Sequence, residues 1–231
     1  MSQSINQVLR DIEKTIPLYY TRPLENGFVG IYNNKNNKLT SVVSEKYVLI
    51  QSRDLFKEVL LSSFNDVHIL NYKLKTNLKK HYLYLRLQKE PYQQKFMVIL
   101  INSVDKSNAL KMLAGVYEWE CGNDLVVFYG FYIKHIGNNN LKLKINLNEI
   151  INHVIYNYND LAKTVNPVPF MNEETLKKLR KIVYLNEERI EQLRKLPNCL
   201  EVYRTITNWM SKKYNIHYFE KLNYLYKFLV G

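Results

Sequence analysis

Cysteine is scarce in this sequence: Cys121 and Cys199 are the only two in 231 residues. They show no Cys-x-x-Cys spacing and have no pair of histidines nearby, so neither a disulfide scaffold nor a structural zinc site is expected. We predict that both cysteines are free thiols.

Long apolar segments are missing as well. No run of uncharged apolar residues is long enough to cross a bilayer, and residues 1–10 lack the apolar core of a signal peptide. We therefore expect a protein of the cytoplasm, here that of a host cell, with no membrane partner.

Acidic residues are in deficit. The chain has 33 Lys and Arg against 21 Asp and Glu, which gives a net charge of +12 at pH 7. A basic folded protein usually has an acidic partner, and nucleic acid is the first candidate. An anionic membrane surface is the second, and basic proteins without such a partner are the third. Apolar residues make up 46% of the chain, enough for a sizeable core.

The signatures of several enzyme classes are absent. The sequence contains no GxxxxGK[ST], GxGxxG, HExxH or GxSxG, so nucleotide hydrolysis, dinucleotide redox chemistry, zincin proteolysis and lipase-type acyl transfer are not expected. No cofactor is predicted. Glu118 and Glu120 share one face of an expected strand, and with Asp105 or Asp124 they could hold a divalent metal for phosphodiester cleavage. Solvated or salt-bridged carboxylates are the more common interpretation.

A nucleophile and a base could also come from Cys121 and His135. Nothing in the sequence fixes the distance between them. A buried structural thiol is the more common role for such a cysteine. An enzymatic function is therefore the less favoured interpretation.

The strongest positive signal is the alternation of apolar and polar residues over positions 80–88, which predicts a half-buried β-strand. Leu83, Leu85 and Leu87 are expected on the core side. The opposite side carries two tyrosines between two cations, namely Lys80, Tyr82, Tyr84 and Arg86. Rings and flexible cations on one face are suited to stacking the bases and holding the phosphates of single-stranded nucleic acid. The same residue types also suit any solvated sheet face.

Positive charge extends into the preceding expected strand. Between Asn71 and Lys95 there are seven Lys or Arg residues against Glu90 alone, a local excess of +6. Because Lys73 and Lys75 lie on the polar side of their strand, the charge could form one patch across neighbouring strands. The nucleic-acid-binding residues that we predict are Lys73, Lys75, Lys80, Tyr82, Tyr84 and Arg86.

Periodicity predicts a mixed region followed by helices. The mixed region has helices at 5–16 and 52–64 (the second capped by Ser52), strands at 28–32, 39–43 and 47–50, an antiparallel meander over 67–102 with a central buried third strand, and strands within 109–119, 125–136 and 141–145. Helices follow at 147–158, 172–185, 186–196 and from 198 onward, the last split near 215. We therefore predict an α+β fold with an antiparallel sheet core and a C-terminal helical region, divided into domains 1–146 and 147–231.

Four short stretches carry a resemblance to a known family: 102–109 (NSVDKSNA), 114–117 (AGVY), 121–126 (CGNDLV) and 134–137 (KHIG). With two further segments at 42–47 and 200–207, the chain resembles the phage- and plasmid-borne family called domain of unknown function 932. It has Glu118 where the family usually has Arg, and Asp124 where the family has Gly. The resemblance implies a mobile-element origin and a β-rich core with C-terminal helices. That layout is similar to the layout of single-strand annealing recombinases.

The leading hypothesis is a non-enzymatic protein of a virus or plasmid that binds single-stranded DNA or RNA and assists strand annealing or replication. A host-directed interaction protein or inhibitor is one alternative, and a metal-dependent nuclease is the other. The apolar helical region and the analogy with annealing proteins predict a homo-oligomer.

Overall fold

The computed structural model describes residues 3–62, 67–92, 94–117, 126–135, 147–163, 172–210 and 216–230. The chain forms two compact units, one of Met1–Leu113 with Gly130–Glu149 and the other of Ala114–Tyr129 with Ile150–Gly231. The fold is α+β as predicted, with two sheets and a helical C-terminal part. The domain boundary after residue 146 stays a prediction.

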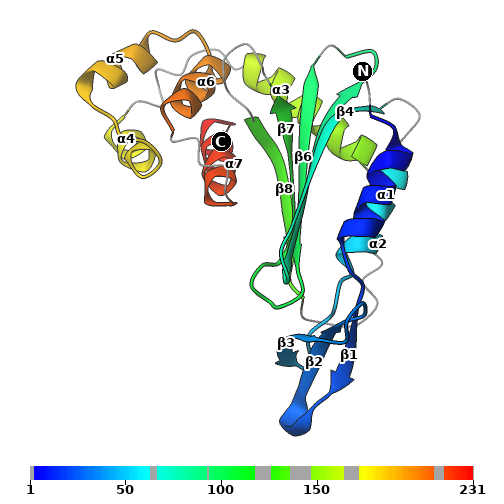
Figure 1. Cartoon of the computed structure of the whole chain (residues 1–231). Coiled ribbons are helices and arrows are strands. Elements are labelled where there is room, and N and C mark those ends of the chain that lie inside the picture. Colours follow the sequence, from blue (N-terminus) through cyan, green and yellow to red (C-terminus); the bar gives the residue numbers. More distant parts are fainter. Residues whose placement is uncertain are drawn as a thin grey trace. The chain divides into compact units, whose positions relative to one another are not determined.

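Two helices of the first unit, α1 (Ile5–Thr15) and α2 (Ser52–Leu61), pack side by side (Figure 1). Both match the predicted helices. Each buries one apolar stripe, and Phe56 of α2 is fully buried. The predicted cap of α2 is off by one residue, because Gln51 occupies the N-cap position. The hydroxyl of Ser52 is instead engaged in a buried network described below.

A small antiparallel sheet has the order β1 (Tyr19–Pro23), β2 (Phe28–Asn33) and β3 (Leu39–Ser44), with a register irregularity at Ile31/Tyr32. The predicted hairpin of β2 and β3 is confirmed. A one-turn 3₁₀ segment (Glu25–Gly27), whose last two residues have positive φ, connects β1 to β2. One face of this sheet packs into a core cluster of Tyr19, Ile31, Val43, Tyr47 and Val104.

The predicted strand at 47–50 is wrong. Only Tyr47 forms an isolated bridge, and residues 48–50 belong to no ladder. Val48 N donates instead to the carbonyl of His135, 2.9 Å away, so this apolar run is used in tertiary packing. The third strand of the small sheet is β1, which sequence analysis missed because Arg22 and Pro23 interrupt its apolar pattern.

The larger sheet has the order β4 (Val67–Thr76), β5 (Lys80–Lys89), β6 (Lys95–Ser103), β7 (Leu110–Tyr117) and β8 (Val126–Ile133). The pairs β4–β5 and β5–β6 are antiparallel. The predicted meander is therefore confirmed. Its third strand, β6, is central, and every residue from Phe96 to Ser103 is buried. The strand predicted at 141–145 lies outside the described residues.

The two faces of β5 differ as predicted. Leu83, Leu85 and Leu87 are fully buried. The helices α1 and α2 cover this face, because Asp11 of α1 accepts a hydrogen bond from Tyr72 of β4, and α2 contacts β6. The intervening residues of β5 are only half-buried.

The C-terminal helices are α3 (Leu147–Lys163), α4 (Glu173–Arg180), α5 (Glu187–Arg194), α6 (Cys199–Trp209) and α7 (Ile216–Val230), in agreement with prediction. Asn172, Asn186 and Asn198 cap α4, α5 and α6, since each side chain accepts a backbone N–H bond of 2.8–3.0 Å. Cys199 is a buried free thiol, as predicted, whereas Cys121 lies outside the described residues. None of the described helices has both the length and the apolar composition that a membrane crossing requires.

Candidate nucleic-acid interface

The six predicted binding residues lie on one face of β4 and β5. In the register of these strands Lys73 is opposite Tyr84 and Lys75 is opposite Tyr82. Directly opposed residues of an antiparallel pair share a face. Arg86 is two residues beyond Tyr84 on the same face of β5, and Lys80 is the first residue of β5, at the other end of the row. We call these six residues the cation–tyrosine face.

The two rings of this face are close and nearly parallel. The ring centroids of Tyr82 and Tyr84 are 6.4 Å apart and their planes differ by 13°. The Lys75 ammonium lies 5.7 Å from the Tyr84 centroid, within reach of a cation–π interaction. Burial, and next the neighbouring Tyr82, raise the pKa of the Tyr84 phenol, so it is neutral at physiological pH.

The accessible area of the cation–tyrosine face does not extend onto the neighbouring strand β6, because the β6 side chains on this side are buried. Ile99 and Ile101 are the β6 partners of Tyr84 and Tyr82, and Met97 is the partner of Arg86. These three side chains are at most 8% exposed. The accessible part is therefore a strip along β4 and β5, rather than a platform that extends across the sheet.

Three lysines of the strip are available for an anionic ligand. Within the described ranges, no carboxylate pairs with Lys73, Lys75 or Lys80. Lys73 and Lys75 are exposed, and Lys80 is half-buried. Because β4 is the edge strand of the sheet as described, a ligand can approach both lysines from the side as well as from above.

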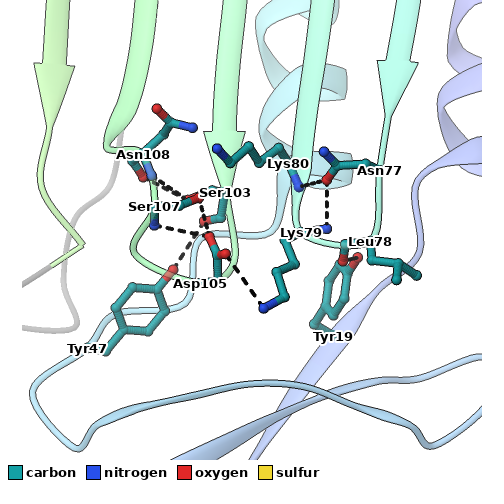
Figure 2. Close-up of polar contacts among 10 residues, drawn as sticks. All are labelled: Tyr19, Tyr47, Asn77, Leu78, Lys79, Lys80, Ser103, Asp105, Ser107 and Asn108. Atoms are coloured by element: carbon teal, nitrogen blue, oxygen red, sulfur yellow. Dashed lines mark hydrogen bonds and ion pairs between the residues drawn. The ribbon is translucent and has the colours of Figure 1, made fainter.

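The turn between β4 and β5, at one end of the strip, holds the backbone of Lys80 in place (Figure 2). The Asn77 side chain accepts hydrogen bonds from the backbone N–H groups of Lys79 (3.0 Å) and Lys80 (2.7 Å). The Tyr19 hydroxyl donates to the carbonyl of Leu78 at 3.1 Å. The β4–β5 turn is thus fixed by side chains, and so is the first residue of β5.

Asp105, one of the carboxylates considered for metal binding, stabilises the neighbouring loop. It accepts hydrogen bonds from the backbone N–H (3.0 Å) and hydroxyl of Ser107, and it lies 3.9 Å from the Lys79 ammonium (Figure 2). Burial raises the pKa of this carboxyl, but the Ser107 hydrogen bonds and Lys79 outweigh it, so the pKa lies below its ordinary value. Its oxygens are therefore committed to the loop.

The catalytic alternatives lie mostly beyond the described part of the chain. Glu118, Glu120, Asp124 and Cys121 are outside it. Among the residues that are described, no three His, Cys, Asp or Glu side chains are grouped so that they could hold a metal ion. His135 is buried, with its ring stacked on Tyr47 at 5.1 Å and its Nδ1 3.1 Å from the Val48 carbonyl. The Cys121/His135 pair, the less favoured alternative, is not tested because Cys121 lies outside the described residues.

Sequence analysis missed a buried polar network behind β5. Asn102 donates to the Ser52 hydroxyl at 2.9 Å, and that hydroxyl lies 2.8 Å from Nδ1 of His81. Nε2 of His81 lies 3.3 Å from the Tyr19 hydroxyl. Since the Tyr19 hydroxyl donates to Leu78, the network assigns the proton of neutral His81 to Nε2.

This Ser–His contact is structural. Ser52 is 1% exposed and His81 is fully buried, so no substrate can reach the hydroxyl. Burial lowers the pKa of His81 to about 4. The alternation that placed Leu83, Leu85 and Leu87 in the core also places His81 there, and this was the signal that could have found it.

A second group of rings and a cation, on the small sheet, was also missed. Tyr20 of β1 and Tyr32 of β2 stack with centroids 5.5 Å apart, and the Arg22 guanidinium lies over both rings at 5.0 and 5.4 Å. The Tyr32 ring lies over Gly30, where an added Cβ would come within 2.7 Å of it. A larger residue at position 30 would require the Tyr32 ring to move.

Comparison of the chain with models of known families, with characterised proteins and with solved structures finds no match. The resemblance to domain of unknown function 932 therefore stays an expectation. In the structure its first stretch, 102–109, forms the end of β6 and the loop that Asp105 stabilises.

Proposed function

We propose that this protein binds single-stranded nucleic acid without enzymatic turnover and acts in strand annealing or replication, as a protein of a virus or plasmid. The observation that carries the proposal is the pairing of Lys73 with Tyr84 and of Lys75 with Tyr82 on one accessible strip. Cations without acidic partners supply phosphate contacts, and the rings supply stacking surfaces.

The strip favours single strands over duplexes for two reasons. Stacking on a side-chain ring needs a base whose flat face is free, which a duplex does not offer. The ring centroids are 6.4 Å apart, close to two rises of about 3.4 Å per base along a strand. The two rings can therefore serve bases of one stacked strand.

Replacing both Tyr82 and Tyr84 by Ala is expected to weaken binding of a labelled single-stranded oligonucleotide by about 1–3 kcal/mol per stacked base. The dependence of affinity on salt should stay nearly unchanged, because rings release no counterions. Fluorescence anisotropy at several salt concentrations measures both quantities. A large loss of stability with unaltered affinity would show that the rings serve only packing.

Replacing Lys73 and Lys75 by Ala should act differently. The slope of log affinity against log salt should flatten by roughly 0.7 for each lost phosphate contact, for any base sequence. The matched control is Lys177→Ala with Lys181→Ala, which removes the same charge from exposed positions at α4. If both double variants change the slope equally, binding depends on net charge and not on the strip.

The same titration, run with and without magnesium, separates the proposal from its alternatives. Cleavage of the oligonucleotide would contradict a non-enzymatic function and favour the nuclease. Absence of binding to single- and double-stranded DNA and RNA would favour a host-directed interaction protein.

A further inference from the structure

The outer edge of β1 is blocked at both ends against strand pairing, at Tyr19 and at Pro23. Leu24 N, just after β1, donates to Phe28 O of β2 (2.8 Å). Since inward and outward backbone groups alternate along an antiparallel strand, the even-numbered residues of β1 bond β2 and the odd-numbered residues turn their backbone N–H and C=O groups outward. The Gln51 amide bonds both outward groups of Tyr19, at 3.1 and 2.6 Å. Pro23 has no N–H to offer.

The outer edge of β3 is open. Glu45 N donates to Gly27 O at 3.1 Å. Because inward and outward backbone groups alternate along an antiparallel strand, Ser41 and Val43 also bond β2. Val42 and Ser44, which lie between these positions in the alternation, turn their backbone groups outward. The Ser44 carbonyl accepts from Tyr47 N (2.9 Å), so the outward groups that can pair with another strand are the N–H and C=O of Val42 and the N–H of Ser44. In the structure as described, no strand lies beyond β3. The six residues of β3 include no charge and no proline, the usual protections of an edge.

The open edge is flanked by exposed apolar side chains. Val42 and Phe28 are each 50% exposed and Leu39 is 52% exposed. Val42 and Phe28, together with Leu24, line a shallow surface pocket of about 660 Å³. Apolar side chains gathered on the surface of a soluble protein mark an interaction site.

We propose that β3 pairs with β3 of a second copy of this chain, antiparallel about a twofold axis, so that the two small sheets become one. Unpaired N–H and C=O groups in strand register call for another β-strand, which nucleic acid cannot provide. The flanking charges select a second copy. Lys38 precedes β3 and Glu45 follows it, and antiparallel pairing brings each Lys38 end beside the Glu45 end of the partner strand.

Sedimentation velocity over a range of concentrations, without nucleic acid, tests whether the full chain dimerises. Hydrogen exchange locates the contact. The amides of Val42 and Ser44 should become protected as the concentration rises, whereas the amide of Thr21 on the outer edge of β1 should not change. A monomer at every concentration, or protection that does not include β3, overturns the proposal.

Val42→Lys should raise the dimer dissociation constant at least about tenfold, because it places two like charges beside the axis. The control is Leu61→Lys, which removes an apolar side chain of similar exposure (62%) from α2 and should leave dimerisation unchanged. Equal effects of the two variants would overturn the proposed interface.

A charge exchange tests the antiparallel orientation. Lys38→Glu and Glu45→Lys should each weaken the homodimer by about fivefold, because the axis repeats every contact. Mixing the two single variants should restore association, since one then has two acidic ends and the other two basic ends. If the mixture associates no better than either variant alone, the antiparallel pairing is wrong.

Discussion

Leu85→Ala is expected to lower the free energy of unfolding by about 2–5 kcal/mol. Leu85 is fully buried in the middle of β5, on the face covered by α1 and α2, opposite Val98 of the buried strand β6. Truncation removes apolar contacts and leaves a cavity that the packed side chains around it cannot fully close. Urea unfolding monitored by circular dichroism measures the loss.

The matched control is Gln88→Ala on the opposite face of the same strand. Gln88 is half-buried and lies at the end of β5, so its truncation should change stability by no more than about 0.5 kcal/mol. Similar losses for both variants would contradict the assignment of the two faces. Oligonucleotide affinity of folded Leu85→Ala should stay at the parent level, because Leu85 does not reach the strip.

Stability should fall as the pH is lowered from about 6.5 toward 4, because His81 is buried in its neutral form. The ordinary pKa of histidine is 6.5, and burial lowers that of His81 to about 4. Between these values the unfolded chain binds a proton that the folded protein does not, so protonation favours unfolding. The full shift corresponds to roughly 3 kcal/mol. Above pH 6.5 this contribution to stability is constant.

Urea midpoints measured between pH 7.5 and 4.5 for the parent and for His81→Gln test this expectation. Glutamine can hydrogen-bond the Ser52 and Tyr19 hydroxyls but does not titrate. The variant should lose most of the pH dependence. Burial also lowers the pKa of His135, so a smaller dependence in the same direction should remain. Identical pH profiles would show that His81 does not titrate as its burial requires.

Period-two and period-3.6 patterns predicted much of the fold from the sequence. The alternation over 80–88 gave both faces of β5, and the uninterrupted apolar run of β6 gave its central position. The helices predicted from 172, 186 and 198 were also found, and the structure shows that the asparagine at each of these positions caps the helix that follows it. These features depend only on neighbouring residues.

Features that depend on distant residues could not be predicted. The strand β1 has no alternation of its own and is defined by its register with β2. His81 gains its role from Ser52 on α2 and Tyr19 on β1, neither of which is close in sequence. All six residues of the cation–tyrosine face were predicted to share one face, but how far the accessible surface extends across the sheet was not predicted. Ile99 and Ile101 of β6 are buried on the same face, which their sequence pattern does not reveal, and this limits the candidate site to a strip along β4 and β5.

The amide of Gln51 stands in for a peptide group at the end of β1, so that one side chain terminates the small sheet as a strand of a single residue would. An assembly unit with two open edges can add neighbours without limit and grow into a fibre. The small sheet has one edge blocked in this way, so it can add a neighbouring copy only at β3. Once two copies join through β3, the two outer edges of the joined sheet are both β1 edges, which are blocked at Tyr19 by Gln51. The assembly therefore stops at two copies.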